Sequence, residues 1–140
     1  MVQSFVTRAR PESVWRILED VENWPRWTPT VLKVKSLAHD WLKVGAKYEV
    51  TQPKLRPAIY EVTECFPNNV FTWIQKMPGA TMIAEHRIIQ NGSFTEVELS
   101  FRCEGFLGNL VGGLFFSKMI SEYVATEARC LKSVCEALAA

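Results

Sequence analysis

Two side chains of this sequence, His86 and Glu64, could transfer protons in predominantly apolar surroundings. A histidine has a pKa near neutrality, so His86 could bind or protonate a carbonyl or enolate oxygen. Glu64 is predicted to lie beside Trp73, and a carboxyl in such surroundings has the raised pKa that a general acid or base requires. The hydroxyl of Tyr60 is a third candidate for proton transfer.

His86 and Glu64 each also have a purely structural interpretation. His86 could be a core histidine whose ring is satisfied by a buried backbone or side-chain partner. Glu64 lies near a predicted strand end and could reach water at the rim of the sheet. In a flat sheet the two residues would be roughly 12 Å apart. At this distance His86 and Glu64 cannot form a dyad in direct contact, but they could bracket a ligand.

The sequence lacks the patterns typical of a metal site or a nucleophile. No ligand spacing links His39 and His86, and none of the four cysteines forms a CxxC motif. Ser117 and Ser121 have no G-x-S-x-G turn and no evident base. We therefore predict no metal, no cofactor and no serine nucleophile.

The candidate residues lie in a region, residues 48–103, whose pattern indicates successive strands. Turn signals at PKLRP, PNN, PGA and NGS divide this region. In the stretch TEVELSFRC, apolar and polar side chains alternate, which is typical of a sheet with one wet face. The Asn91-Gly92 pair before it is a strong hairpin signal.

Two-residue turns at 68–69, 78–79 and 91–92 would fix the register of three hairpins. The first would pair Glu64 with Trp73 and Glu61 with Lys76. The second would pair Phe71 with His86 and Trp73 with Ala84, and the third His86 with Val97. These registers agree on one inner face, composed of Tyr48, Val50, Tyr60, Val62, Glu64, Phe71, Trp73, Gln75, Met82, His86, Val97, Leu99 and Phe101. It holds more polar groups than a solid core usually does.

The N-terminal region supplies a strand over residues 2–8 and then a helix that begins at Pro11. The following segment, DVENWPRWTPTV, carries two tryptophans and two prolines, unlike an ordinary polar connection. We expect it to pack at the base or mouth of an internal pocket, followed by a strand near residues 31–37.

A long helix is predicted after Gly105, with an apolar stripe through Leu110, Leu114, Ser117, Ser121, Val124, Ala128, Leu131, Cys135 and Leu138. The small polar residues at its middle would leave room for a cavity against the sheet. Gly112 and Gly113 could delay the start of this helix.

Length and charge narrow the class of protein. At 140 residues the chain has the size of one domain, spanning 1–140. Sixteen basic and fifteen acidic residues, spread along the chain, give no basic stripe for nucleic acid. No signal peptide pattern or run long enough for stable membrane insertion is present, so we expect a cytoplasmic protein with reduced cysteines. The oligomeric state stays open, with a homodimer as one option.

The order of these elements resembles the START-like, SRPBCC superfamily, especially its polyketide cyclase/dehydrase and lipid-transport branch. The resemblance is carried by PESVWRILEDVENWPRW, GAKYEVTQP, VTECFPNNVFTW, the histidine of EHRI, the T-x-V-x-L strand with Gly105, and ARCLKSVCEAL. It implies an α+β helix-grip fold: a curved antiparallel sheet of about seven strands wrapped around a long C-terminal helix, with two short helices after the first strand.

The resemblance also implies an internal pocket for a hydrophobic small molecule. The residues expected to line it are Trp27, Tyr48, Tyr60, Phe71, Trp73, Gln75, Met82, His86, Leu99, Phe101, Phe115 and Ser121. Core packing would use many of the same aromatic residues, so spacing alone does not distinguish a pocket wall from a core.

Three functions follow as hypotheses. The first is binding, transport or sequestration of a lipid, polyketide or aromatic metabolite. The second is a cyclase or dehydratase in which His86, with Glu64 or Tyr60, transfers protons. The third is a protein-interaction module that has lost its pocket. The superfamily hosts all these classes, so the resemblance specifies the fold better than the activity.

Overall fold

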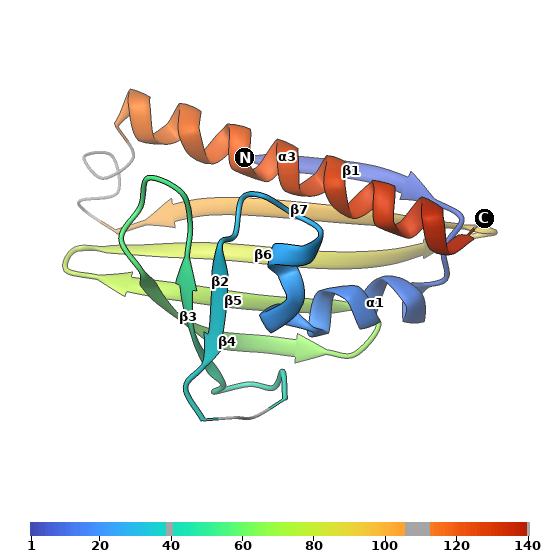
Figure 1. The fold of residues 1–140 in the computed structure, drawn as a ribbon, viewed down its shortest axis with the longest axis horizontal. Helices are drawn as coiled ribbons and strands as arrows, with labels where there is room; N and C mark the ends of the chain where they lie inside the picture. The colour runs from blue at the N-terminus through green and yellow to red at the C-terminus, as the bar shows by residue number, and fades with distance from the viewer. Residues whose placement is uncertain (39–40, 106–112, 140) are drawn as a thin grey trace.

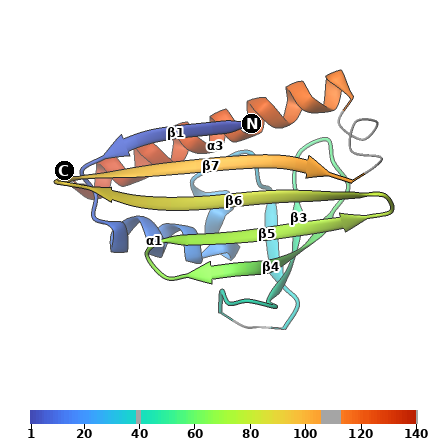
Figure 2. The ribbon, with the colours of Figure 1, turned by 180° about the vertical axis from the view of Figure 1, so that it is seen from behind.

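A computed structural model describes residues 1–38, 41–105 and 113–139 of the chain. Seven antiparallel strands form one curved sheet in the order β1-β7-β6-β5-β4-β3-β2. A long C-terminal helix crosses one face of the sheet, and the short helices that follow the first strand lie on the same side (Figure 1). None of the described helices lies on the opposite face of the sheet (Figure 2). The predicted helix-grip architecture is confirmed.

The elements are β1 (Val2–Thr7), α1 (Pro11–Glu19), the 3-10 helix η1 (Val21–Arg26), β2 (Lys33–Ser36), β3 (Lys47–Thr51), β4 (Ala58–Phe66), β5 (Val70–Met77), β6 (Ala80–Asn91), β7 (Phe94–Glu104) and α3 (Leu114–Ala139).

The β5–β6 and β6–β7 hairpins place His86 on the inner face of the sheet. The β5–β6 register is as predicted, with Phe71 opposite His86 and Trp73 opposite Ala84. In the β6–β7 hairpin the turn lies one residue later than predicted, between Asn91 and Phe94. His86 therefore pairs with Leu99 instead of Val97. A shift of two residues in register leaves every side chain on its predicted face.

The β4–β5 hairpin departs from the prediction, and the prediction for Glu64 is wrong. Phe66 pairs with Val70, so three residues form the loop, with Asn68 in the left-handed conformation (φ 66°). Near this turn Glu64 faces Thr72, whose hydroxyl donates to its carboxylate across 3.3 Å. A bulge between Val62 and Glu64 then restores the expected alternation along the rest of the strand.

The predicted β4–β5 pairs are wrong along the whole hairpin, but the bulge explains why the predicted inner face fails only at Glu64. Val62 pairs with Trp73, and both are buried, as the inner-face prediction requires. Glu64 and its partner Thr72 lie on the outer face, away from the helices. Glu61 pairs with Ile74 and not with Lys76, and its carboxylate lies 3.7 Å from the ammonium of Lys47.

The Trp/Pro segment after α1 is a structural part of the core. Helix α1 begins at Pro11, as predicted, because proline fits the first position of a helix. After Asp20, residues 21–26 form η1, in which Trp24 is buried to 1% exposure. The indole N–H of Trp24 donates to the carbonyl oxygen of Leu18 at 3.0 Å, so the buried ring has its polar group satisfied.

Helix α3 packs against the sheet along the predicted stripe from Val124 to Cys135 and departs from that stripe at Ser121 and Leu138. Ile120, Ala128, Leu131 and Cys135 are its buried residues, whereas Ser121 is exposed and Leu138 is 59% exposed. The early part of the predicted stripe lies at 110–112, outside the described residues. None of the described helices combines the length and hydrophobicity that a membrane crossing requires.

Candidate functional site

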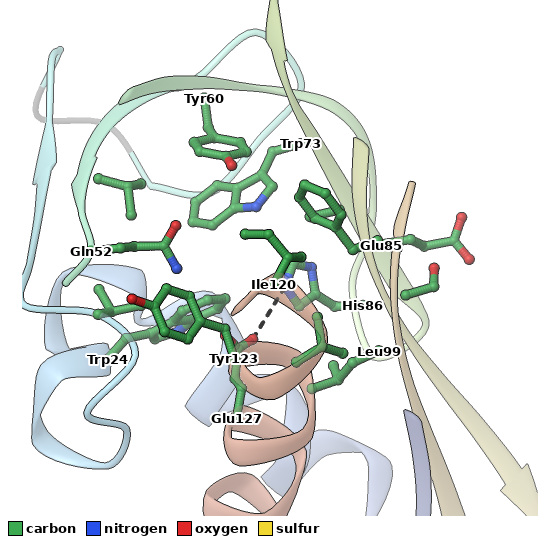
Figure 3. Close-up of a pocket in the computed structure, with 16 residues that line it drawn as sticks. Trp24, Gln52, Tyr60, Trp73, Glu85, His86, Leu99, Ile120, Tyr123 and Glu127 are labelled. Atoms are coloured by element: carbon green, nitrogen blue, oxygen red, sulfur yellow. Dashed lines mark ion pairs between the residues drawn. The ribbon is translucent and has the colours of Figure 1, made fainter. Parts of the chain in front are cut away.

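An internal cavity of about 60 Å³ lies between the sheet and helix α3 (Figure 3). The sheet supplies one wall, η1 with the segment that follows it supplies another, and α3 closes the third. A second hollow of about 110 Å³ adjoins it, because the two share Gln52, Tyr60, Phe101 and Ile120 among their lining residues. The inner cavity is lined by Trp24, Val31, Val50, Gln52, Tyr60, Trp73, Ala84, Glu85, His86, Leu99, Ser100, Phe101, Ile120, Tyr123, Val124 and Glu127. The outer hollow adds Leu55, Arg56, Ala58, Gln75, Met77, Met82 and Phe116.

Aromatic rings form the apolar part of the inner wall. The ring centroid of Trp73 lies 5.4 Å from that of Trp24 and 5.2 Å from that of Tyr60. Trp24 also meets the edge of the His86 ring at 5.3 Å. Such tilted and edge-on contacts fix the rings by packing, so the wall is rigid before any ligand arrives.

His86 is held on β6 with one ring nitrogen committed to the backbone. Its Nδ1 lies 3.3 Å from the carbonyl oxygen of Phe71, and its ring stacks on the Phe71 ring at 4.1 Å. A carbonyl oxygen can only accept a hydrogen bond, so Nδ1 carries the proton. Burial lowers the pKa of His86 to about 4, although the Phe71 carbonyl works in the opposite direction. His86 is therefore neutral at pH 7, with an unprotonated Nε2.

Glu127 on α3 faces this Nε2 atom. Its Oε1 lies 3.8 Å from Nε2 of His86, the contact dashed in Figure 3, and its side chain is 14% exposed. The hydroxyl of Thr30 donates to Oε2 at 3.4 Å. Burial raises the pKa of Glu127 to about 7, and the Thr30 hydrogen bond only partly offsets this. Near neutral pH the carboxyl thus exchanges its proton readily.

Tyr60 and Gln52 bring further polar groups to the cavity. Burial, and secondly the charge of Glu127, raise the pKa of Tyr60 to about 12, so its hydroxyl stays a neutral donor. Gln52 donates through its amide nitrogen to the carbonyl of Thr30 at 3.2 Å. On the α3 side, the hydroxyl of Tyr123 donates to the carbonyl of Pro53, which ties the loop after β3 to the helix.

The structure brings most of the predicted site residues to the two hollows. Tyr60, Trp73, His86, Leu99 and Phe101 line the inner cavity, and Gln75 and Met82 line the outer hollow. Tyr48 and Phe71 are fully buried behind these walls, where their rings contact Trp73.

Besides Tyr48 and Phe71, four more predicted site residues are not placed in the cavity. Trp27 lies outside it and packs against Trp24, which takes the place at the wall that was expected for Trp27. Ser121 is exposed, because its neighbour Ile120 is the residue buried at this turn of α3. Glu64 lies on the outer face as a consequence of the bulge. The side chain of Phe115 lies outside the described residues.

Sequence reasoning missed Glu127, the most perturbed acidic group of the site. A signal was present, since Ile120, Val124, Glu127 and Leu131 recur at spacings of four, three and four. A carboxylate within such an apolar stripe is the kind of residue that marks a functional position. The predicted stripe shared Val124 and Leu131 with this one but took Ala128 in place of its neighbour Glu127.

No group of three or more residues with metal-ligating side chains occurs within residues 1–38, 41–105 and 113–139. The four cysteines are unpaired thiols, and burial raises the pKa of Cys135 to about 12. Among the described residues, the neutral imidazole of His86 and the carboxyl of Glu127 meet in the cavity, and the neutral hydroxyl of Tyr60 lines it as well.

Comparison with known proteins gives one family and many similar folds. The family described as "Polyketide cyclase / dehydrase and lipid transport" matches residues 1–138. A START superfamily protein from Mycobacterium smegmatis is 19% identical, with a TM-score of 0.71 over 99% of this chain and 97% of its own. Ara h 8.0201 is 6% identical, with a TM-score of 0.73 over 96% of this chain and 95% of its own.

The di-domain ARO/CYC protein BexL is 16% identical, with a TM-score of 0.70 over 95% of this chain but only 45% of its own. At these identities the solved structures show a shared fold alone. A search of curated protein sequences found no match.

Proposed function

Because the chain belongs to the polyketide cyclase/dehydrase and lipid transport family, we propose that it binds a hydrophobic small molecule between its sheet and helix α3. The observation that carries this proposal is the cavity itself: an aromatic wall around a few convergent polar groups. Ligand sites are typically concave and mostly apolar, with a small number of polar groups that fix orientation.

The size of the two hollows limits the ligand. The inner cavity alone, at about 60 Å³, is smaller than the cavity of about 150 Å³ that holds benzene in an engineered protein. The adjoining hollow adds about 110 Å³. A compound with one ring fits the pair, and a second ring or a longer chain would have to extend past Arg56 toward the solvent.

Binding would draw its free energy from apolar contact with the wall. Each Å² of apolar ligand surface removed from water contributes about 25 cal/mol. Trp24 and Trp73 offer rigid faces for this contact and lose little entropy, because their rings are already packed. The polar atoms of His86 and Glu127 would set the orientation.

Native mass spectrometry of freshly purified protein, followed by solvent extraction, tests this proposal. We expect a co-purifying apolar compound, or binding of added one-ring and two-ring compounds by calorimetry. The variant Ala84→Leu fills the cavity and should weaken binding at least tenfold. Ala137→Leu makes the same exchange at an exposed position on α3 and serves as the control.

The two variants also define the contrary result. If folded Ala84→Leu binds the same compounds as tightly as Ala137→Leu does, the cavity is not the binding site. If neither the wild-type protein nor the control binds any apolar compound, the ligand-binding proposal fails.

A second candidate function, a cyclase or dehydratase, is favoured by the contact between His86 and Glu127. In a dehydration, Nε2 of His86 would accept a proton from carbon, and protonated Glu127 would donate one to the hydroxyl that leaves as water. This assigns the acid role to Glu127, whose pKa of about 7 suits proton transfer at neutral pH. Turnover of an extracted compound that is lost in both His86→Gln and Glu127→Gln would support this function.

A further inference from the structure

The gap between His86 and Glu127 is too long for a direct hydrogen bond. Nε2 and Oε1 are 3.8 Å apart, whereas an O–H···N hydrogen bond spans about 2.7–3.0 Å. Both residues line the cavity. An oxygen atom placed at its edge, about 2.8 Å from each of the two atoms, would complete the contact.

The hydrogen-bonding capacities of the two atoms differ. Nε2 of His86 can only accept, because Nδ1 holds the ring proton against the Phe71 carbonyl. Glu127 donates when it is protonated and accepts when it is ionised, while Thr30 anchors its other oxygen. An oxygen between them must therefore donate a hydrogen bond to Nε2 or to the ionised carboxylate. When Glu127 is protonated, the oxygen must also accept a hydrogen bond from its carboxyl. A hydroxyl group has this pair of capacities.

The charges of the walls reinforce this requirement. Among the described residues that line the inner cavity, Glu127 is the acid directed inward, and Glu85 points away from the cavity (Figure 3). None of these described residues is a lysine or arginine. Arg56 contributes a cation only to the outer hollow, where it is exposed. A ligand carboxylate at the inner end would face Glu127 without a compensating cation.

We propose that the two adjoining hollows select an uncharged aromatic compound whose hydroxyl group enters the inner cavity and bridges Nε2 of His86 and the carboxyl of Glu127. The inference rests on the proposed function, since it assigns a chemical class to the ligand of that same cavity. Carboxylic acids of equal size are excluded by desolvation and by the charge of Glu127. Purely apolar compounds of equal size bind more weakly, because they leave the polar pair unpartnered.

Three compounds that differ only in one group test this selection: 4-ethylphenol, ethylbenzene and 4-ethylbenzoate. Their dissociation constants are measured by calorimetry at pH 8, where the phenol is neutral and the benzoate is ionised. For the wild-type protein we expect the phenol to bind about tenfold more tightly than ethylbenzene. The benzoate should bind at least tenfold more weakly than the phenol. This ranking needs no variant and does not depend on how a substitution folds.

The variant Glu127→Gln keeps the shape of the side chain and removes its charge. We expect phenol binding to weaken and benzoate binding to strengthen, so that the ratio between them falls to less than threefold. Glu64→Gln makes the same exchange on the outer face of the sheet and should keep the wild-type ratio. Circular dichroism confirms that each variant is folded.

The outcomes separate this inference from the proposed function. If the three compounds bind equally, or the benzoate binds most tightly, the hydroxyl selection is overturned while the cavity remains a binding site. An unchanged ratio in folded Glu127→Gln overturns the role of Glu127 in the same way. If none of the three compounds binds, and extraction yields no apolar compound, the proposed function itself fails.

Discussion

The burial of His86 and Glu127 predicts two opposite pH dependences of stability, which single variants should reveal. Burial lowers the pKa of His86 from 6.5 to about 4. The folded protein then binds fewer protons at this site than the unfolded chain does, so stability rises as the pH increases from about 4 to 6.5. Burial raises the pKa of Glu127 from 4.5 to about 7. Here the folded protein binds more protons, so stability falls as the pH increases from 4.5 to about 7.

The two contributions are similar in size. Each pKa unit corresponds to about 1.4 kcal/mol, so either shift changes the free energy of unfolding by about 3 kcal/mol over its range. In the wild-type protein the two slopes oppose each other between pH 4.5 and 6.5. Tyr60 is the other described titratable group that faces Glu127, and with a pKa of about 12 it does not titrate in this range.

Replacing one member of the pair isolates the slope of the other. In Glu127→Gln only the His86 slope remains, so relative to wild type the variant should gain about 3 kcal/mol between pH 4.5 and 7. In His86→Gln only the Glu127 slope remains, so relative to wild type the variant should gain stability as the pH falls from 6.5 to 4. Urea unfolding at half-unit pH steps measures both differences.

The matched control for Glu127→Gln is Glu64→Gln, on the outer face of the sheet. If the stability difference of Glu127→Gln follows that of the control across the whole range, Glu127 is not desolvated in solution. The assignment of the cavity as a water-poor site would then be refuted.

Two further substitutions test the structure that surrounds the cavity. Trp24→Phe removes the indole donor and leaves the buried carbonyl of Leu18 unpaired, so the free energy of unfolding in urea titrations should fall by about 1–3 kcal/mol. An unchanged urea midpoint would contradict this account. Gly105→Ala should be more destabilising than Gly92→Ala in the same assay. A Cβ at Gly105 (φ 110°) would lie 2.5 Å from the Gly79 carbonyl oxygen, whereas a Cβ at Gly92 (φ 65°) would meet nothing within 4 Å. Equal losses of stability would mean that backbone strain alone, about 1–3 kcal/mol at each site, accounts for both.

The faces of the strands could be predicted because side chains alternate with a period of two. The β6–β7 turn was misplaced by one residue, yet His86 kept its predicted face, since the resulting register shift was even. The three-residue loop after Phe66 changed the parity, and only the bulge at residues 62–64 corrected it. A bulge leaves no clear mark in a single sequence, so the placement of Glu64 could not be predicted.

The phase of a long helix is harder to predict than the faces of a strand. A helix has 3.6 residues per turn, so two overlapping stripes one position apart can both look apolar. The stripe through Ser121 and the stripe through Ile120 share Val124 and Leu131, and only packing shows that Ile120 is buried and Ser121 exposed. The choice between them decided whether Glu127 was recognised. In the same way, the tryptophans of the segment at 20–31 were expected at the pocket, but which of Trp24 and Trp27 reached it depended on the turn of η1.

The cost of burying Glu127 argues that it is kept for a purpose other than packing. Its raised pKa means that ionisation near neutral pH opposes folding, and the Thr30 hydrogen bond offsets only part of this. A leucine or glutamine at this place on α3 would fill the same stripe without that cost. His86 adds a second cost, because its Nε2 faces the carboxyl across a gap that neither side chain closes. His86 and Glu127 are adjacent, each is unfavourable for stability, and both line one cavity. A solid core avoids such a pair, whereas a binding or proton-transfer site requires one.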